Sequence, residues 1–250
     1  METVVCIPTR RPPPVLTLMS YMPRADRRIL VITDSSDLDL LHSHENHYRN
    51  FPNIRVVMGA TGMGAQSAKC YEWAAKLHSK YFFRLDDDLP EKTFVHKDGH
   101  FPSIEEVIRE AEKCLVELKV SLAGFVNSSN PFYLGNHEYR RTYGIIHGGA
   151  NLSIPTYEPE KFIDPALLRC EDIYRTCAHR LWDLNHLGDG RNGRVQHIGI
   201  DKRKSTGKQG GNVSTISLTR EQILAQRQII KDRFPNFISI LDDKKVRFRP

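Results

Sequence analysis

The chain has 250 residues, which is long enough for one sizeable α/β domain with its own hydrophobic core. Hydrophobic residues make up 40% of the sequence and charged residues 26%, a balance typical of a soluble globular protein. The longest apolar runs are far too short to span a membrane. A formal net charge of +6 and a pI of about 9.1 favour a polyanionic partner.

Cysteine usage and the N-terminal segment indicate the compartment. The five cysteines are an odd number and form no C-x-x-C pair, which is typical of a protein in a reducing environment. Residues 1–8 lack the basic region and apolar core of a signal peptide. We therefore expect a cytoplasmic protein with no membrane partner.

The first third of the chain alternates between β-branched or aromatic runs and helical patterns. The runs predict strands at residues 3–7, 29–33, 54–58 and 81–85. Three helices are expected in this part of the chain. The first covers residues 12–21, the second follows a capping segment at 34–36, and the third covers residues 65–78. This alternation predicts a doubly wound, mostly parallel sheet flanked by helices.

The rest of the chain continues as a mixture of strands, helices and long loops. Residues 89–102 are expected to form a loop or hairpin, and Ser103 with Glu106 resembles a capping box for a helix that ends near residue 119. Further strands are expected at 122–126, 143–147, 150–154 and 195–200. Further helices are expected at 164–182 and, capped by Thr219 and Gln222, at 219–234. The long polar and aromatic segment 127–141 is expected to be a functional or mobile loop.

An acidic triplet, Asp86-Asp87-Asp88, follows the strand expected at residues 81–85. Ligands of α/β proteins bind outside the carboxyl ends of the strands. Three adjacent carboxylates repel one another, and a hard divalent cation relieves that repulsion. The triplet therefore favours a metal site, and a solvated turn is the alternative.

Two further segments suit a diphosphate substrate. Gly62-Met63-Gly64 opens a helix and could seat a phosphate on backbone N–H groups, although a tight strand-to-helix turn explains it equally well. Residues 188–208 contain six Lys or Arg and two Asp, a local charge of 6 − 2 = +4. A metal together with this basic segment would neutralise charge on a departing diphosphate, whereas a purely solvated face is the alternative.

In this order the motifs resemble those of GT-A glycosyltransferases, over most of residues 3–211. The resemblance implies a GT-A-like fold and assigns Asp86 and Asp88 to the D-x-D pair that holds Mn²⁺ or Mg²⁺. It assigns His197 to the late histidine of the metal shell, with a core histidine bonded to a backbone carbonyl as the alternative. It assigns Glu171 and Asp172 to the x-E-D element, whose Asp is the catalytic base in inverting members. An ordinary acidic first turn of a helix is the alternative for that pair.

The same resemblance implies which residues hold the donor, expected to be a UDP-sugar. The residues assigned to nucleotide-sugar binding are Pro8, Thr9, Arg10, Asp34, Gly62, Gly64, Lys69, Arg84, Asp87, Gly149, Ala150, Lys202 and Lys208.

More narrowly, the size and basic character resemble the TET/J-binding-protein-associated glycosyltransferases, which modify hydroxymethylated pyrimidines in phage and protist DNA. This implies a DNA acceptor containing 5-hydroxymethylcytosine or a related base, and the cytosol of a phage-infected bacterium as the setting. The residues expected to bind DNA are Tyr133, Arg203, Lys204, Lys244, Lys245 and Arg247. Residues 89–102 and the C-terminal tail have no counterpart in the resemblance.

The sequence thus predicts one GT-A-like domain. Residues 1–100 would bind the nucleotide sugar, 101–218 would carry the acceptor and catalytic groups, and 219–250 would form a helix and a basic tail. The alternatives are a glycosyltransferase for a glycan, protein or small molecule, and a non-catalytic basic module that binds nucleic acid. A nucleotidyltransferase is a further alternative among enzymes.

Overall fold

The computed structural model describes residues 3–21, 27–128, 130–168, 170–201, 218–240 and 246–250. The strands are β1 (Thr3–Thr9), β2 (Ile29–Thr33), β3 (Ile54–Met58), β4 (Tyr81–Leu85), β5 (Phe94–His96), β6 (Leu122–Val126), β7 (Tyr139–Thr142), β8 (Ala150–Ser153), β9 (Asn192–Ile200), β10 (Ile238–Ile240) and β11 (Val246–Phe248). The α-helices are α1 (Leu16–Tyr21), α2 (Leu38–Tyr48), α3 (Met63–Lys76), α4 (Ile104–Leu118), α5 (Glu171–Leu187) and α6 (Arg220–Arg233), and the short 3-10 helices are η2 (Pro131–Tyr133) and η3 (Pro159–Lys161). No helix within these ranges is both long and apolar enough to cross a membrane.

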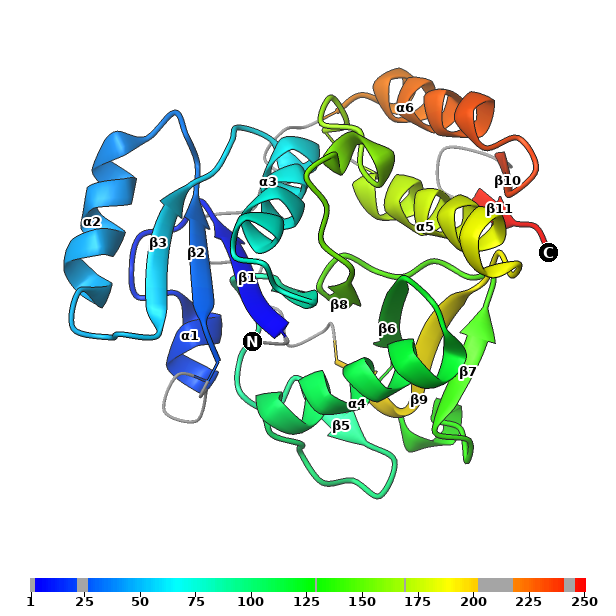
Figure 1. Ribbon diagram of the computed structural model, residues 1–250, viewed down its shortest axis with the longest axis horizontal. Coiled ribbons are helices and arrows are strands. Elements are labelled where there is room, and N and C mark those ends of the chain that lie inside the picture. Colours follow the sequence, from blue (N-terminus) through cyan, green and yellow to red (C-terminus); the bar gives the residue numbers. More distant parts are fainter. Residues whose placement is uncertain (1–2, 22–26, 129, 169, 202–217, 241–245) are drawn as a thin grey trace.

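One large mixed sheet forms the centre of the described structure (Figure 1). Its strand order is β3-β2-β1-β4-β8-β6-β9-β5, and β7 pairs with β9 off this path. The pairings give β1, β2, β3, β4, β6 and β9 one direction, whereas β5, β7 and β8 run the opposite way. The prediction of a mostly parallel α/β sheet is therefore confirmed.

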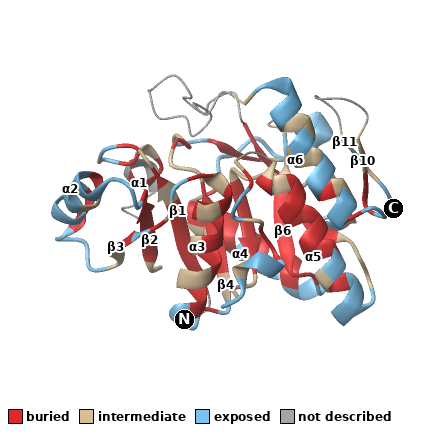
Figure 2. Ribbon diagram, turned by 90° about the horizontal axis from the view of Figure 1, so that it is seen from above, coloured by how far each residue is buried: buried red, intermediate tan, exposed pale blue. Residues whose placement is uncertain are grey.

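The two faces of the sheet are covered by different helices because successive side chains of a strand point to opposite faces. In β1, Val5 and Ile7 belong to one buried cluster, which includes residues of α1 and α4. Val4 and Cys6 belong to the other, which includes residues of α3, α5 and α6. Figure 2 shows the sheet and the inward faces of the helices buried, with the outer surfaces of α2 and α6 exposed.

Several element boundaries differ from the sequence predictions. The strand expected at 143–147 is absent, and the strand that pairs with β9 is β7, at 139–142. The helix expected from residue 164 begins at Glu171, because 164–167 form a turn and Cys170 has a left-handed backbone (φ 63°) that interrupts helical geometry. Asp37, not the 34–36 segment, caps α2 by accepting from the N–H of Leu40.

Other local predictions are confirmed. Ser103 accepts from the N–H of Glu106 at the start of α4, and Thr219 and Gln222 form a complete capping box on α6. Within the expected basic tail, residues 246–248 form the antiparallel strand β11.

Helix α5 carries a buried polar stripe with one residue per turn, formed by Glu171, Arg175, His179 and Asp183. His179 lies between the hydroxyls of Tyr71 (2.8 Å from Nε2) and Ser121 (2.7 Å from Nδ1). Asp183 accepts the backbone N–H of Ser121 at 3.1 Å. Burial raises the pKa of Asp183 to about 6, although its bonds to Ser121 lower it. The stripe therefore fixes the rotation of α5 about its axis.

Candidate active site

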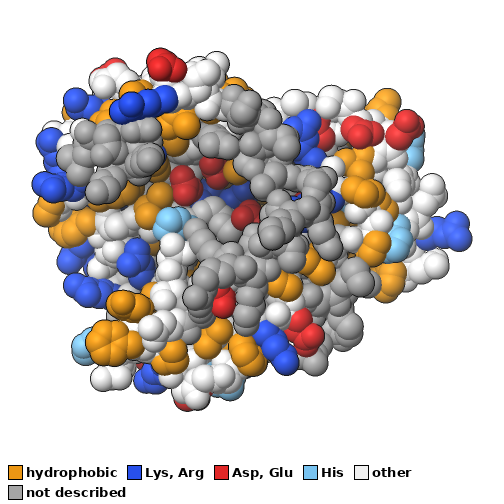
Figure 3. Space-filling model, turned by 180° about the vertical axis from the view of Figure 1, so that it is seen from behind, with side chains coloured by type: hydrophobic (Ala, Val, Ile, Leu, Met, Phe, Trp, Pro, Cys, Tyr) orange, Lys and Arg blue, Asp and Glu red, His pale blue; other side chains and the backbone are white. Residues whose placement is uncertain are grey.

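The polar residues singled out in the sequence meet at the carboxyl edge of the parallel strands. Thr9, the last residue of β1, pairs with Thr33, the last residue of β2, so Arg10 and Asp34 follow side by side. Strand β4 runs parallel to β1 and ends immediately before Asp86. On the face opposite to the view of Figure 1, acidic and basic side chains gather near the middle of the molecule (Figure 3). This edge is where a doubly wound sheet binds its ligand.

Two members of the acidic triplet are held by the end of β1. Asp87 accepts a 2.6 Å hydrogen bond from the Thr9 hydroxyl and lies 3.5 Å from Nε of Arg11. Burial raises the pKa of Asp87 to about 6, against the lowering effect of Thr9 and Arg11. Asp88 lies 3.4 Å from Nη2 of Arg11. The Arg11 guanidinium thus contacts both carboxylates and offsets part of their repulsion.

Asp86 is the most accessible of the three, with 39% of its side chain exposed. Its backbone N–H donates to the carbonyl of Gly149 at 2.9 Å, because β8 pairs antiparallel with β4. A Cβ atom on Gly149 would lie 3.3 Å from Oδ2 of Asp86, so the glycine keeps the space beside this carboxylate open. The structure therefore brings Gly149 and Ala150 next to Asp86.

Asp86 and Asp88 are the residues of the triplet whose chemistry suits a hard divalent cation. Both supply carboxylate oxygens, the ligands that Mg²⁺ and Mn²⁺ prefer, while Asp87 is already bonded to Thr9. The uncrowded side of Asp86 next to Gly149 leaves room for the water or substrate oxygens that such a cation retains.

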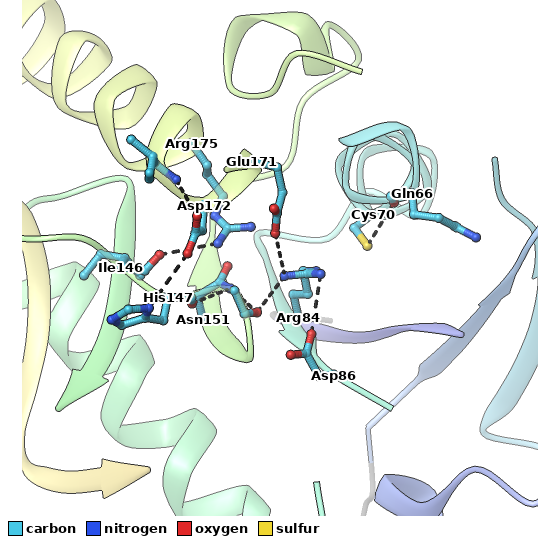
Figure 4. A network of polar contacts seen from close by, with 12 residues as sticks. Gln66, Cys70, Arg84, Asp86, Ile146, His147, Asn151, Glu171, Asp172 and Arg175 are labelled. Atoms are coloured by element: carbon cyan, nitrogen blue, oxygen red, sulfur yellow. Dashed lines mark hydrogen bonds and ion pairs between the residues drawn. The ribbon is translucent and has the colours of Figure 1, made fainter. Parts of the chain in front are cut away.

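Arg84 joins the acidic triplet to helix α5 (Figure 4). Its side chain is only 5% exposed; Nη2 lies 3.5 Å from Asp86, and Nη1 lies 4.0 Å from Glu171. Nη1 also donates a 2.6 Å hydrogen bond to the carbonyl of Gly148. Burial disfavours the charged guanidinium, but the charges of Asp86 and Glu171 outweigh it and raise the pKa of Arg84. Arg84 therefore stays cationic in the interior.

The two acids that open α5 have different surroundings. Glu171 is 4% exposed, and burial together with the charge of Asp172 raises its pKa. Asp172 is more accessible, with 24% of its side chain exposed and Oδ2 3.8 Å from Nδ1 of His147. The Asn127 amide lies 3.2 Å from Nε2 of His147 and can donate to it, which leaves the imidazole proton on Nδ1, facing Asp172. Asp172 is the one of the two that an incoming molecule can reach.

Arg10 and Asp34 form an ion pair of 2.7 Å at the ends of β1 and β2. Oδ1 of Asp34 also accepts from the hydroxyls of Ser36 and Thr61, both at 2.7 Å. Burial raises the pKa of Asp34, but these bonds and the Arg10 charge bring it below its ordinary value. Asp34 is thus an anion that contacts the segments following β1, β2 and β3, through Arg10, Ser36 and Thr61. Arg10 is the more accessible member of the ion pair, with 32% of its side chain exposed.

The glycine turn before α3 is more closely packed than a phosphate seat would be. The N–H of Gly64 donates to the carbonyl of Leu167 at 3.0 Å, and a Cβ there would lie 2.5 Å from the carbonyl oxygen of Asp164. Gly62 has φ 99°, a conformation that favours glycine. Lys69 is paired with Glu72 at 2.6 Å in the same helix. These contacts favour the tight-turn alternative.

His197 has protein partners at both ring nitrogens. Nδ1 lies 3.0 Å from the backbone carbonyl of Glu138, and Nε2 lies 3.1 Å from the Glu110 carboxylate of α4. This arrangement matches the alternative of a core histidine bonded to a backbone carbonyl. The metal-ligand prediction for His197 finds no support in it.

The remaining predicted residues are distributed as follows. Pro8 lies within β1, and Tyr133, in η2, is 63% exposed beside Phe132, which is 87% exposed. Arg247 lies exposed on β11. The predictions for Lys202, Arg203, Lys204, Lys208, Lys244 and Lys245 fall outside the described residues.

Sequence reasoning missed several members of this site. Arg11 bridges Asp87 and Asp88, and Thr17 donates a 2.6 Å hydrogen bond to the backbone carbonyl of Asp86. His147 contacts Asp172. Arg11 follows Arg10, which was assigned to the donor site, so its position in the sequence could have indicated a role there. The contacts of Thr17 and His147 depend on tertiary packing and leave no local signal.

This strand order and site position define a GT-A-like, Rossmann-type fold, which confirms the predicted fold class. Solved structures with a similar fold include S. aureus TarS in complex with UDP-GlcNAc, with a TM-score of 0.55, 16% identity, and coverage of 94% of this chain and 72% of that chain. The mannosyltransferase PcManGT from Pyrobaculum calidifontis, in complex with GDP-Man and Mn²⁺, has a TM-score of 0.57 and 13% identity, with coverage of 92% of this chain and 64% of that chain. No protein-family model matches the sequence, and neither does any curated protein.

Replacing Arg84 tests whether its buried charge holds the site together. Arg84→Met should lower the free energy of unfolding by about 3–5 kcal/mol, because it removes the cation paired with Asp86 and one of the two arginines that act on buried Glu171. Urea unfolding followed by circular dichroism measures this. Arg109→Met, at an exposed position of α4, should stay within about 0.5 kcal/mol of the parent protein. Equal stability of the two variants would contradict a structural role for the Arg84 charge.

Proposed function

We propose that this protein is a metal-dependent glycosyltransferase that uses a nucleotide-sugar donor. The observation that carries the proposal is that Asp86 contacts the Gly149 backbone and is joined through Arg84 to Glu171 at the start of α5, at the carboxyl edge of a GT-A-like sheet. The bound UDP-GlcNAc of TarS and the GDP-Man and Mn²⁺ of PcManGT support this chemistry for the shared fold.

The donor side would be built from the first 100 residues. Asp86 and Asp88 would hold the Mn²⁺ or Mg²⁺ ion, which neutralises charge on the departing nucleoside diphosphate. Arg10 supplies an accessible cation at the end of β1. The buried Arg84 guanidinium would orient the Asp86 carboxylate, and the absence of a side chain on Gly149 leaves space beside it.

The catalytic side, within residues 101–218, would use Asp172 as general base. An alcohol is a weak nucleophile at neutral pH, and a carboxylate that accepts its proton promotes attack on the anomeric carbon. As the new carbon–oxygen bond forms, the bond from the anomeric carbon to the diphosphate oxygen breaks, and the nucleoside diphosphate leaves with its electron pair. One such displacement inverts the anomeric configuration. The His147 Nδ1–H, 3.8 Å from Asp172, would orient the carboxylate.

The acceptor is proposed to be a 5-hydroxymethylpyrimidine in DNA. Asn127, which contacts His147, begins a loop that presents Phe132 and Tyr133, with 87% and 63% of their surfaces exposed. Aromatic rings of this kind stack on bases that leave the duplex. The loop thus supports a surface for a flipped nucleobase, connected through His147 to Asp172, the proposed general base.

An arginine-rich pocket on β7 supports a polyanionic acceptor. It has a volume of about 460 Å³ and is lined by Leu118, Tyr139, Arg140, Arg141, Thr142, Tyr143 and Arg191. Arg141 and Arg191 share the single carboxylate of Asp189, and Arg140 is exposed. Glu110 also reaches this pocket, where it accepts a 2.8 Å hydrogen bond from the Tyr139 hydroxyl. The three guanidinium groups suit a phosphate backbone.

Substitution of the acidic pair tests the metal proposal. Asp88→Asn and Asp86→Asn should each weaken Mn²⁺-dependent binding of UDP or GDP at least about tenfold, because one hard oxygen ligand becomes a neutral amide. Calorimetric titration with and without Mn²⁺ measures the effect. Asp39→Asn, at an exposed position of α2, is the matched control. Full transfer by the Asp88→Asn variant in the presence of a chelator would rule out metal dependence.

Substitution of Asp172 tests the base. Asp172→Asn should reduce kcat by about a hundredfold or more, while donor affinity stays within about twofold. Initial rates of transfer, together with donor titration, separate the two effects. Glu160→Gln, exposed in η3, is the control. If Asp172 only complements the helix dipole, the variant instead loses about 0.3–1 kcal/mol of stability and keeps its kcat.

The acceptor is tested by incubation of hydroxymethylcytosine-containing duplex DNA with a panel of nucleotide sugars, followed by mass spectrometry of the nucleosides. We expect a hexose-sized mass increase on hydroxymethylcytosine, and at least about a tenfold loss of rate in Phe132→Ala and Tyr133→Ala because base stacking contributes about 1–3 kcal/mol. Phe51→Ala, at a partly exposed aromatic after α2, is the control.

Equally rapid transfer to free hydroxymethyl nucleosides or to glycans would contradict DNA as the acceptor. DNA binding without transfer of any sugar would favour the non-catalytic alternative.

A further inference from the structure

The segment between β5 and α4 forms a tight turn that has no role in the proposed reaction. Two backbone hydrogen bonds close this turn. The N–H of His96 donates to the carbonyl of His100, and the N–H of Gly99 donates to the carbonyl of His96, both at 2.9 Å. Gly99 has φ 90°, a conformation that a side chain would strain. Strand β5 pairs with β9, so the turn is anchored to the main sheet. The turn therefore places His96 and His100 on the same side.

Three potential metal ligands converge on this turn. Nδ1 of His96 lies 2.9 Å from Oδ1 of Asp98, and Nδ1 of His100 lies 2.6 Å from the same oxygen. The two imidazole rings stack with centroids 4.5 Å apart. One ligand atom from each residue lies within 4.8 Å of the others. Nitrogens and a carboxylate oxygen this close can be bridged by one cation with small side-chain shifts, since ligands about 2 Å from a metal are themselves about 3 Å apart.

A second carboxylate orients the His100 ring. Nε2 of His100 lies 3.2 Å from Oε1 of Glu106, in the first turn of α4. This contact keeps a proton on Nε2 and leaves Nδ1 available as a ligand, the arrangement in which metal-bound histidines are held by an outer carboxylate. On the other side, the edge of His197 packs on His96 with centroids 5.2 Å apart, and His197 is itself fixed by Glu110. Both histidine rings are thus positioned by neighbours on other elements.

We propose that His96, Asp98 and His100 form a second metal site, specific for a Zn²⁺-like transition-metal ion. Two imidazole nitrogens and one carboxylate oxygen suit Zn²⁺, and water would complete a four-coordinate shell. The all-oxygen pair Asp86 and Asp88 suits Mn²⁺ or Mg²⁺ instead. The two sites therefore differ in ligand chemistry, and this site stands whether or not the protein transfers a sugar.

Zinc titration of the full chain tests the proposal, in an Asp88→Asn background that weakens the acidic pair. We expect about one equivalent of Zn²⁺ to bind, and His96→Ala and His100→Ala each to weaken it at least tenfold. Glu106→Gln should weaken it by about tenfold or more without removing a ligand. X-ray absorption of the zinc-bound protein should give nitrogen and oxygen neighbours at about 2.0–2.2 Å.

Matched controls are His42→Ala, at an exposed histidine of α2, and Glu117→Gln, at an exposed position of α4. Both should bind zinc as the parent does. His100→Asn is a second variant that retains a polar side chain, so it is expected to fold. It should nevertheless lose zinc binding. Unchanged zinc affinity in His100→Asn and His96→Ala would overturn the site, and so would the absence of zinc binding in a folded Asp88→Asn protein.

Discussion

The site depends on a positive charge inside the protein. Arg84 is nearly inaccessible, and a guanidinium there is tolerated only because Asp86, Glu171 and the Gly148 carbonyl surround it. These partners come from the end of β4, the start of α5 and the loop before β8. One side chain therefore fixes the relative positions of the three segments that line the carboxyl edge. Removal of water from this group strengthens each of its contacts and so holds these segments firmly together.

The reversed direction of β8 makes this arrangement possible. A parallel strand beside β4 would leave the sheet at the same edge as Asp86, whereas antiparallel β8 enters there, so Gly148 and Gly149 arrive beside the carboxylates. A Cβ on Gly148 would lie 2.9 Å from Nη1 of Arg84. The two glycines thus allow a backbone turn to approach both an arginine and an aspartate.

Local sequence patterns predicted the parallel strands and the carboxylates at their ends well, because burial and strand ends leave a periodic signal. The acidic triplet was expected at a strand end in this way, whereas Asp172 and Gly149 were assigned from the resemblance. The structure places Gly149 beside Asp86. His197 was assigned to the metal shell from the resemblance, as a histidine on a late strand. In the structure, its ring nitrogens lie next to the Glu110 carboxylate and the Glu138 carbonyl, contacts that depend on tertiary packing. The pairing of Arg11 with the triplet joins residues 77 apart and leaves no local trace. The start of α5 was misplaced because the left-handed backbone of Cys170 cannot be recognised from its residue type.

The polar stripe of α5 has a consequence for which segments near the carboxyl edge can vary in sequence. Arg84 pairs with Glu171 at one end of the helix, and the Ser121 backbone bonds to Asp183 near the other end. A shift of the helix by one turn would therefore leave buried charges without partners. Asp172 is thus a fixed reference point in the molecule. Sequence variation is tolerated more readily in the loop between β6 and β7, where Phe132 and Tyr133 are exposed. A helix start fixed by buried charges thus lies next to a loop with exposed aromatic rings, to which Asn127 and His147 connect it.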